Sequence, residues 1–155
     1  MRTWLVDTGP LVAYLDSQDP AHREVAECLD SFTGALAATS AVITEAMHFL
    51  SATPTGPRLL AELVRTSGIG VFDLCQPPEL DAAAALMEKY TDTPMDFADA
   101  TLVLLAEALG QNEILTLDRR GFSVFRTRRG MPFRRVLGGG AEVHSPHKTR
   151  RISRI

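Results

Sequence analysis

Residues 93–120 read TPMDFADATLVLLAEALGQNEILTLDRR, and the order of elements in this stretch decides the fold. A long apolar run predicts a helix over about 94–109, with Thr93 as its N-cap and Pro94 in its first turn, where a missing N–H is tolerated. After a loop, the β-rich run 114–117 predicts a short strand. A helix that leads directly into a strand is typical of a parallel α/β sheet.

Three carboxylates occupy the ends of these two elements. Asp118 closes the strand, and Asp96 and Asp99 stand near the start of the helix. Both helix carboxylates could simply favour the positive end of the helix dipole, and for Asp96 this interpretation is as good as a ligand role. It fits Asp99 less well, because Asp99 shares a stripe with apolar residues one turn further on. A carboxylate on a buried stripe needs a cation or hydrogen-bond donors.

The rest of the chain alternates between short β-rich runs and amphipathic segments. We expect strands at 3–6, 35–38 and 71–74, a last edge strand near Val124 or within 133–137, and helices at 9–15 with Thr8 as the cap, 20–32, 40–50, 58–67 and 79–90. This order predicts a parallel sheet covered by helices on both faces. We expect one domain over 1–137, followed by a flexible basic tail at 138–155 that is rich in Gly, Ser, Pro, Lys and Arg.

Composition excludes several classes of protein. The chain has 155 residues, of which 45% are hydrophobic and 23% charged, as is usual for one globular domain. No segment approaches the roughly 20 uninterrupted apolar residues that a membrane span needs. Cys28 and Cys75 are isolated, so neither a disulfide framework nor a cysteine metal site is expected. The N-terminus reaches an acidic residue too early for a signal peptide, and we therefore expect a cytoplasmic protein.

The net charge of −3 conceals a strong asymmetry. Residues 1–118 contain 5 Lys and Arg against 18 Asp and Glu, whereas residues 119–155 contain 11 Lys and Arg against a single Glu. Such a division predicts a basic region that faces a polyanion and an acidic region that faces a cation or a basic partner. A solvated basic tail is the simpler explanation of the second half taken alone.

Two further carboxylates complete an acidic set. Asp7 follows the first predicted strand, and Glu45 lies among apolar neighbours on the helix predicted at 40–50. With Asp99 and Asp118 they would repel one another strongly in one crevice unless a cation lay between them. Oxygen ligands without Cys or His suit Mg²⁺ or Mn²⁺. Phosphoryl transfer with a water activated by one or two metal ions is the chemistry that uses such a set.

The four acidic positions lie in stretches that resemble a known family. These stretches are LVDTGPLVAYLD around Asp7, TSAVITEAMHFL around Glu45, MDFADATLVLLAEALG around Asp99 and ILTLDRRGF around Asp118. In this order and spacing they resemble PIN domains, in particular the VapC-like ribonuclease toxins of type II toxin–antitoxin pairs. The resemblance covers about 3–137. It implies a three-layer α/β/α sandwich with a central parallel sheet of four or five strands.

The resemblance also implies an activity and partners. It implies Mg²⁺-dependent endonucleolytic cleavage of RNA, with Mn²⁺ as a substitute metal, restrained by a cognate antitoxin. Asp7, Glu45, Asp99 and Asp118 match the family's catalytic and metal-binding positions. Asp96 is an added carboxylate that could take the place of Asp99 as the main helix ligand, and Thr8 and Thr116 are expected to support the site from behind the ligands. The expected RNA-binding residues are Arg119, Arg120, Arg126, Arg128 and Arg129. We also expect a homodimer.

Two other functions were weighed against the nuclease. A non-catalytic RNA- or protein-binding module on the same scaffold would need a broken acidic site, and all four positions are intact. A phosphatase of the haloacid-dehalogenase kind would need a second Asp two residues after Asp7, where this chain has Gly9. We therefore favour the metal-dependent endoribonuclease.

Overall fold

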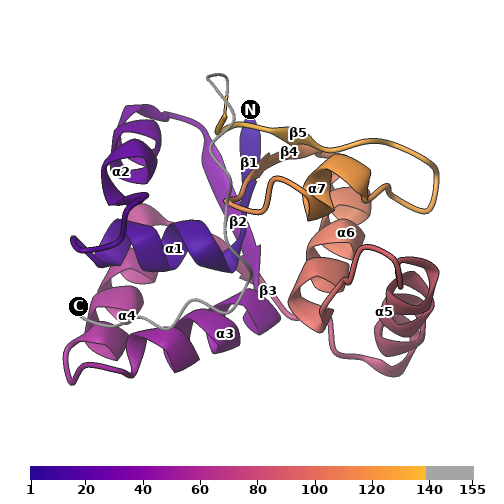
Figure 1. The fold of residues 1–155 in the computed structure, drawn as a ribbon, viewed down its shortest axis with the longest axis horizontal. Coiled ribbons are helices and arrows are strands. Elements are labelled where there is room, and N and C mark those ends of the chain that lie inside the picture. Colours follow the sequence, from indigo (N-terminus) through magenta and orange to yellow (C-terminus); the bar gives the residue numbers. More distant parts are fainter. Residues whose placement is uncertain (139–155) are drawn as a thin grey trace.

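Five parallel strands form one sheet in the computed structural model, which describes residues 1–138 (Figure 1). The strands are β1 (Thr3–Val6), β2 (Ala35–Thr39), β3 (Gly70–Phe72), β4 (Glu113–Leu115) and β5 (Arg134–Arg135), and their spatial order is β3-β2-β1-β4-β5. Every pairing between neighbouring strands is parallel. The predicted parallel sheet of four or five strands is thus confirmed.

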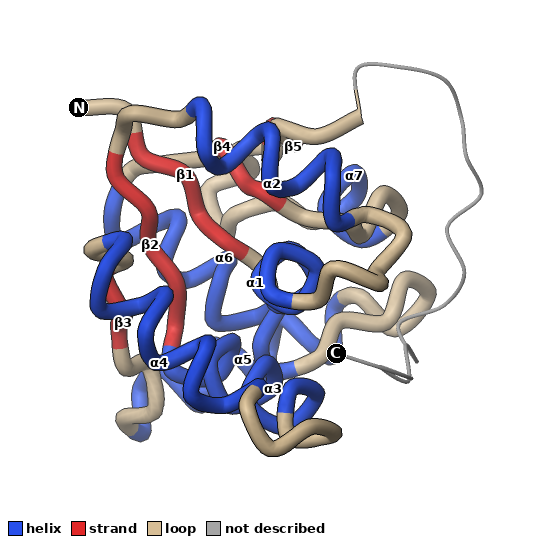
Figure 2. The backbone as a smooth tube through the Cα atoms, turned by 90° about the vertical axis from the view of Figure 1, so that its left-hand side faces the viewer, coloured by secondary structure: helices blue, strands red, loops and turns tan. Residues whose placement is uncertain are grey.

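Helices cover both faces of this sheet. One layer contains α1 (Thr8–Leu15), α2 (His22–Ser31), α3 (Ser40–Leu50) and α4 (Gly56–Ser67), and the other contains α5 (Pro77–Lys89), α6 (Phe97–Leu109) and α7 (Gly121–Val124). The two layers lie on the left and right of the sheet in Figure 1, and the turned view of Figure 2 places the first layer in front. The structure is therefore a three-layer α/β/α sandwich, as predicted.

The order of the strands creates a switch point beside β1. The chain first builds outward from β1 through β2 to β3, then returns to place β4 on the other side of β1. In open α/β sheets the crevice at the carboxyl ends of the strands on either side of such a point is the usual ligand site. Val6 pairs with Leu115 in the parallel register, so the residues that follow these two leave the sheet side by side.

The helix α6 is buried over most of its length. All nine residues from Ala98 to Ala106 are buried, including Asp99 and Thr101. The unbroken apolar run predicted this burial, because a helix that is apolar on most of its surface must be enclosed by other elements. Any polar side chain on α6 therefore has to find its hydrogen-bond partners within the protein.

Two predicted helix starts were wrong. α6 begins at Phe97 with Asp96 as its N-cap, so that Thr93 and Pro94 precede the helix. Asp96 is the N-cap in place of the predicted Thr93, because its carboxylate accepts a hydrogen bond from a backbone N–H in the first turn of the helix. For the same reason the N-cap of α1 is Asp7, whose carboxylate accepts from the backbone N–H of Thr8.

The segment after β4 decides between the two candidate edge strands. Val124 ends the short helix α7, so a strand there was wrong, and the last strand is Arg134–Arg135 within the other predicted range. The predicted tail at 138–155 lies outside the described residues, apart from Gly138. In the part of the chain that the structure describes, no helix has the length and apolar character needed to cross a membrane.

Candidate active site

Asp7 and Asp118 are joined through one buried threonine at the switch point. The hydroxyl of Thr116 donates to Oδ2 of Asp7 over 2.8 Å, and the hydroxyl oxygen of Thr116 accepts from the backbone N–H of Asp118 over 3.0 Å. Oδ1 of Asp7 accepts from the backbone N–H of Thr8 over 2.8 Å. These bonds fix the rotamer of Asp7, and a carboxylate with about four acceptor positions can make them and still bind a cation. These contacts of Thr116 fit the supporting role that the resemblance implies, and that role stays a prediction.

A tight turn fixes the second carboxylate of this pair. Oδ1 of Asp118 accepts from the backbone N–H groups of Arg120 over 3.2 Å and of Gly121 over 2.9 Å. A Cβ atom at position 121 would collide with Oδ2 of Asp118 and with the ring of Phe125. Only glycine leaves room for the carboxylate here, a requirement that the sequence analysis did not identify.

Asp96 and Asp99 bind each other's backbone across the first turn of α6. Oδ1 of Asp96 accepts from the N–H of Asp99 over 2.8 Å, and Oδ2 of Asp99 accepts from the N–H of Asp96 over 3.1 Å. This reciprocal pattern is a capping box. The donors that a buried carboxylate requires are therefore present for Asp99, which is only 1% exposed. Its role as a metal ligand stays a prediction beside this structural role.

The helix that carries Glu45 starts at the same edge of the sheet, in the other helical layer. The helix α3 starts directly after β2 and spans Ser40–Leu50, the range predicted for it. Glu45 is half-buried in the second turn of α3, between the buried Val42 and the half-buried Phe49. All four candidate carboxylates thus lie on elements that start or end at the carboxyl edge of the sheet. Their joint action on a metal stays a prediction.

The donor types at this edge fit Mg²⁺. Among residues 1–138, no group of three or more His, Cys, Asp or Glu side chains is gathered closely enough to hold a metal ion as it stands. Mg²⁺ does not need such a cage, because it keeps several waters and commonly binds one or two carboxylates. The buried hydroxyl of Thr8, next to Asp7, makes no hydrogen bond within the described part of the chain. An additional polar ligand near Asp7 would satisfy it.

Among the five candidate RNA-binding arginines, the structure separates Arg128 from Arg119 and Arg120. Arg119 and Arg120 follow Asp118 directly and lie at the carboxyl edge of the sheet, beside that candidate ligand. Arg128 instead binds Glu107 near the other end of α6, through its backbone N–H and a 2.7 Å ion pair from its guanidinium. Since Glu107 is eight residues beyond Asp99, the two carboxylates are about 12 Å apart along the helix axis.

The remaining two arginines of the set, Arg126 and Arg129, lie on the segment between α7 and β5. Arg126 donates through its guanidinium to the backbone carbonyls of residues 123–125, which are left open by the end of α7. Arg129 is exposed beside Gly130, which adopts a left-handed φ of 86° at the tip of the loop. Arg119 and Arg120 are thus next to the candidate ligand Asp118 in the chain, whereas Arg128 is bound near the other end of α6.

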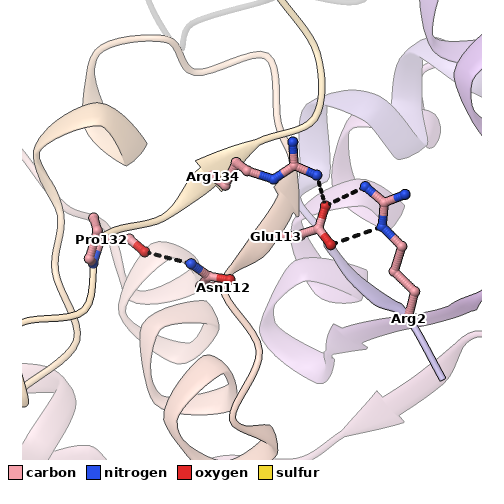
Figure 3. Close-up of polar contacts among 5 residues, drawn as sticks. All are labelled: Arg2, Asn112, Glu113, Pro132 and Arg134. Carbon is pink, nitrogen blue, oxygen red and sulfur yellow. Dashed lines mark hydrogen bonds and ion pairs between the residues drawn. The ribbon is translucent and has the colours of Figure 1, made fainter.

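An ion-pair cluster joins neighbouring segments at the amino ends of the strands, opposite the candidate site. Glu113, the first residue of β4, lies between Arg2 and Arg134, as Figure 3 shows. Two hydrogen bonds of 2.9 and 2.8 Å join its carboxylate to Arg2, and this pairing, aided by Arg134, lowers the pKa of Glu113 to about 2. The cluster ties the start of β4 to the segments that begin β1 and form β5. It thereby holds in register the strands whose other ends carry Asp7 and Thr116.

Comparison with known proteins identifies the family. No protein-family model matches the sequence. The chain is 38% identical over 124 residues to Ribonuclease VapC26 of Mycobacterium tuberculosis, an alignment that covers 79% of this chain and 91% of that protein. The chain belongs to the VapC family of ribonuclease toxins.

Solved structures of VapC20, VapBC2 and FitAcB share the fold. VapC20 of Mycobacterium tuberculosis, described as a sarcin–ricin-loop-cleaving toxin, superposes with a TM-score of 0.67 at 19% identity and covers 77% of this chain and 92% of its own. VapBC2 of Rickettsia felis, solved with a fragment of its promoter DNA, gives a TM-score of 0.61 at 12% identity, covering 86% and 98%. FitAcB of Neisseria gonorrhoeae gives 0.55 at 19% identity, covering 78% and 91%. The PIN-like architecture expected from the VapC resemblance is confirmed.

Proposed function

We propose that this VapC-family chain is the toxin of a toxin–antitoxin pair and an Mg²⁺-dependent endoribonuclease. The observation that carries the proposal is the 38% identity to a ribonuclease of the same family across 91% of that protein's length. The placement of Asp7 and Asp118 at the switch point of the sheet supports it, because ligands of open α/β sheets bind there. Mn²⁺ would replace Mg²⁺, since both prefer oxygen ligands.

Asp7, Glu45, Asp99 and Asp118 would hold the metal, with Asp96 as a further candidate ligand. When bound, Mg²⁺ would supply Lewis-acid activation of a water and stabilisation of charge on the departing oxygen. The protein's own contribution is orientation: Thr8 and Thr116 hold the two oxygens of Asp7, and a backbone turn holds Asp118. Side chains held in this way need little rearrangement when the phosphodiester arrives.

The substrate of this site would be RNA, held through its phosphates by Arg119 and Arg120. Both arginines follow Asp118, so a phosphate beside that carboxylate is within reach of their side chains. The partner would be a cognate antitoxin protein, a proposal that the toxin–antitoxin assembly from Rickettsia felis supports by its shared fold. The expected homodimer stays a prediction.

Cleavage by the purified protein tests the function. RNA should be cut in the presence of Mg²⁺ or Mn²⁺, and cutting should stop when a chelator is added in excess. Asp7→Asn should remove nearly all cleavage, whereas Asp81→Asn, on the exposed surface of α5, is the matched control and should retain it. Cleavage that continues in excess chelator would refute the metal mechanism. Tight RNA binding without cleavage at any metal concentration would favour the non-catalytic module.

A further inference from the structure

Two buried threonines connect the helical layers at the carboxyl edge of the sheet. Thr39 is the last residue of β2 and is 0% exposed, and Thr101 lies in the second turn of α6 and is 1% exposed. Their hydroxyl oxygens are 2.8 Å apart. The bond links a strand end that leads into α3 with a helix from the opposite layer of the sandwich.

The neighbouring hydrogen bonds decide which of the two hydroxyls is the donor in this contact. Thr101 donates to the backbone carbonyl of Ala98 over 2.7 Å, and the backbone N–H of Val42 donates to the hydroxyl oxygen of Thr39 over 3.2 Å. A hydroxyl has a single proton to donate. Thr39 must therefore donate to Thr101, which gives one continuous chain from the N–H of Val42 to the carbonyl of Ala98. Any other arrangement leaves a buried hydroxyl proton without an acceptor.

This chain ends beside two of the candidate metal ligands. Val42 lies in the first turn of α3, three residues before Glu45, and Ala98 is the residue before Asp99. Burying two hydroxyls has a free-energy cost that valine, with nearly the same volume, would avoid. A fully satisfied buried pair makes the local structure rigid in return.

We infer that Thr39 and Thr101 are positioning residues that set the separation of Glu45 from Asp99. The inference rests on the proposed function, because it assumes that these two carboxylates bind a common divalent cation. α3 and α6 cover different faces of the sheet, and the hydroxyl bond joins the N-cap residue of α3 to the second turn of α6. Loss of the bond lets the two carboxylates move apart and weakens cation binding.

Thr101→Val tests the role directly, since valine keeps the shape and loses the hydroxyl. Cation binding is measured without RNA, from the rise in melting temperature as Mg²⁺ or Mn²⁺ is added, and separately from the Mg²⁺ dependence of cleavage. Loss of a group that orients a metal ligand commonly weakens affinity 10- to 100-fold, so we expect the half-saturating Mg²⁺ concentration of T101V to rise about tenfold or more. Thr101→Ser retains the hydroxyl and should restore the wild-type value.

A second buried threonine provides the matched control for lost stability. Thr127 is 3% exposed and accepts from the backbone N–H of Met131, in the loop that packs near the far end of α6. Thr127→Val should also lower the melting temperature but leave the half-saturating Mg²⁺ concentration unchanged. If T101V does not fold, Thr101→Ala replaces it, because alanine is the best helix former and adds no bulk.

The outcomes separate this inference from the proposed function. A wild-type response to Mg²⁺ in T101V, or an equal weakening in T127V, would overturn the positioning role and leave the ribonuclease proposal intact. A wild-type protein that shows neither stabilisation by divalent cations nor cleavage would overturn both.

Discussion

The hydroxyl of Thr116 lies 2.8 Å from Oδ2 of Asp7 and joins the carboxyl ends of β4 and β1. Since it also accepts from the backbone of Asp118, this one side chain orients two candidate ligands. We expect Thr116→Val to lower Mg²⁺-dependent cleavage by about 10- to 100-fold. Thr116→Ser should retain most of the activity. Cleavage rates measured over a range of Mg²⁺ concentrations check this, and equal rates in T116V and wild type would contradict it.

Gly121→Ala should damage both stability and activity. The added Cβ meets Oδ2 of Asp118 and the ring of Phe125, so the carboxylate or the turn has to shift. Forcing a methyl group into such a site typically costs about 1–3 kcal/mol of unfolding free energy. Gly9→Ala is the control, because its Cβ would lie 3.4 Å from Leu117, within reach of a small adjustment. Urea unfolding and cleavage assays on both variants give the comparison.

The cap and ligand roles of the α6 carboxylates can be measured separately. Asp96→Ala and Asp99→Ala each remove one bond of the capping box, and we expect each to lower the unfolding free energy by about 1 kcal/mol. Asp96→Asn and Asp99→Asn keep an acceptor oxygen and should be closer to wild type in metal-free stability.

Stabilisation by Mg²⁺ then identifies the ligand. Binding to the folded state alone raises the melting temperature by mass action, so the variant that loses this response has lost the ligand. We expect Asp99→Asn to lose it and Asp96→Asn to retain most of it. The reverse result would assign the ligand role to Asp96.

Acid should weaken the amino edge of the sheet through Glu113. Its pKa in the folded protein is about 2, below the ordinary value of 4.5, so its stabilisation is complete above pH 4.5 and is lost as pH falls toward 2. Solvent screens the two half-exposed arginines, and we therefore expect a contribution on the order of 1 kcal/mol.

Urea unfolding at pH 6 and pH 3 tests this pH dependence. Glu113→Gln should be less stable than wild type at pH 6, and the difference should shrink at pH 3. Glu62→Gln, at an exposed position of α4, is the control and should show no such change. A constant difference at the two pH values would show that the ion pairs contribute nothing to the pH dependence.

Arg119 and Arg120 should differ from Arg128 in their effect on RNA binding. Replacing Arg119 and Arg120 with Gln removes two charges beside Asp118. The plot of log affinity for single-stranded RNA against log salt concentration should then become shallower, its negative slope shrinking in magnitude by about 1.4. Arg128→Gln breaks the contact with Glu107 and should reduce stability with little change in that slope. Salt titrations of RNA binding with each variant decide the matter. A larger change in R128Q would place the RNA over the distant loop.

The fold could be predicted because hydrophobic periodicity is local. The range of α3 was correct at both ends, and the burial of α6 followed from its apolar run. The start of α6 could not be predicted as well, since Thr93, Asp96 and the proline between them all offer plausible starts. The spacing of Asp96 and Asp99 was the available signal for a capping box, although that motif usually has Ser or Thr before Glu or Gln.

The candidate site could be predicted only in part. The resemblance placed Asp7, Thr116 and Asp118, and the structure brings these three together. The resemblance gave no indication of the hydrogen bond between Thr39 and Thr101. This contact spans 62 residues of sequence and depends on the tertiary packing of two helical layers. Sequence proximity was also misleading for Arg128, which is close to Asp118 in the chain but binds Glu107 near the far end of α6.

The place of β1 in the sheet has a consequence for the timing of synthesis. β1 is made well before β4, and the bond from Thr116 to Asp7 must wait for a residue 109 positions after Asp7. At about 5–20 residues per second, a ribosome needs roughly 5–20 s to cover that distance. During this interval the nascent chain can build β1, β2 and β3 but not the paired aspartates. The aspartate pair that the proposed activity uses is therefore assembled only after helices α1 to α6 have been made.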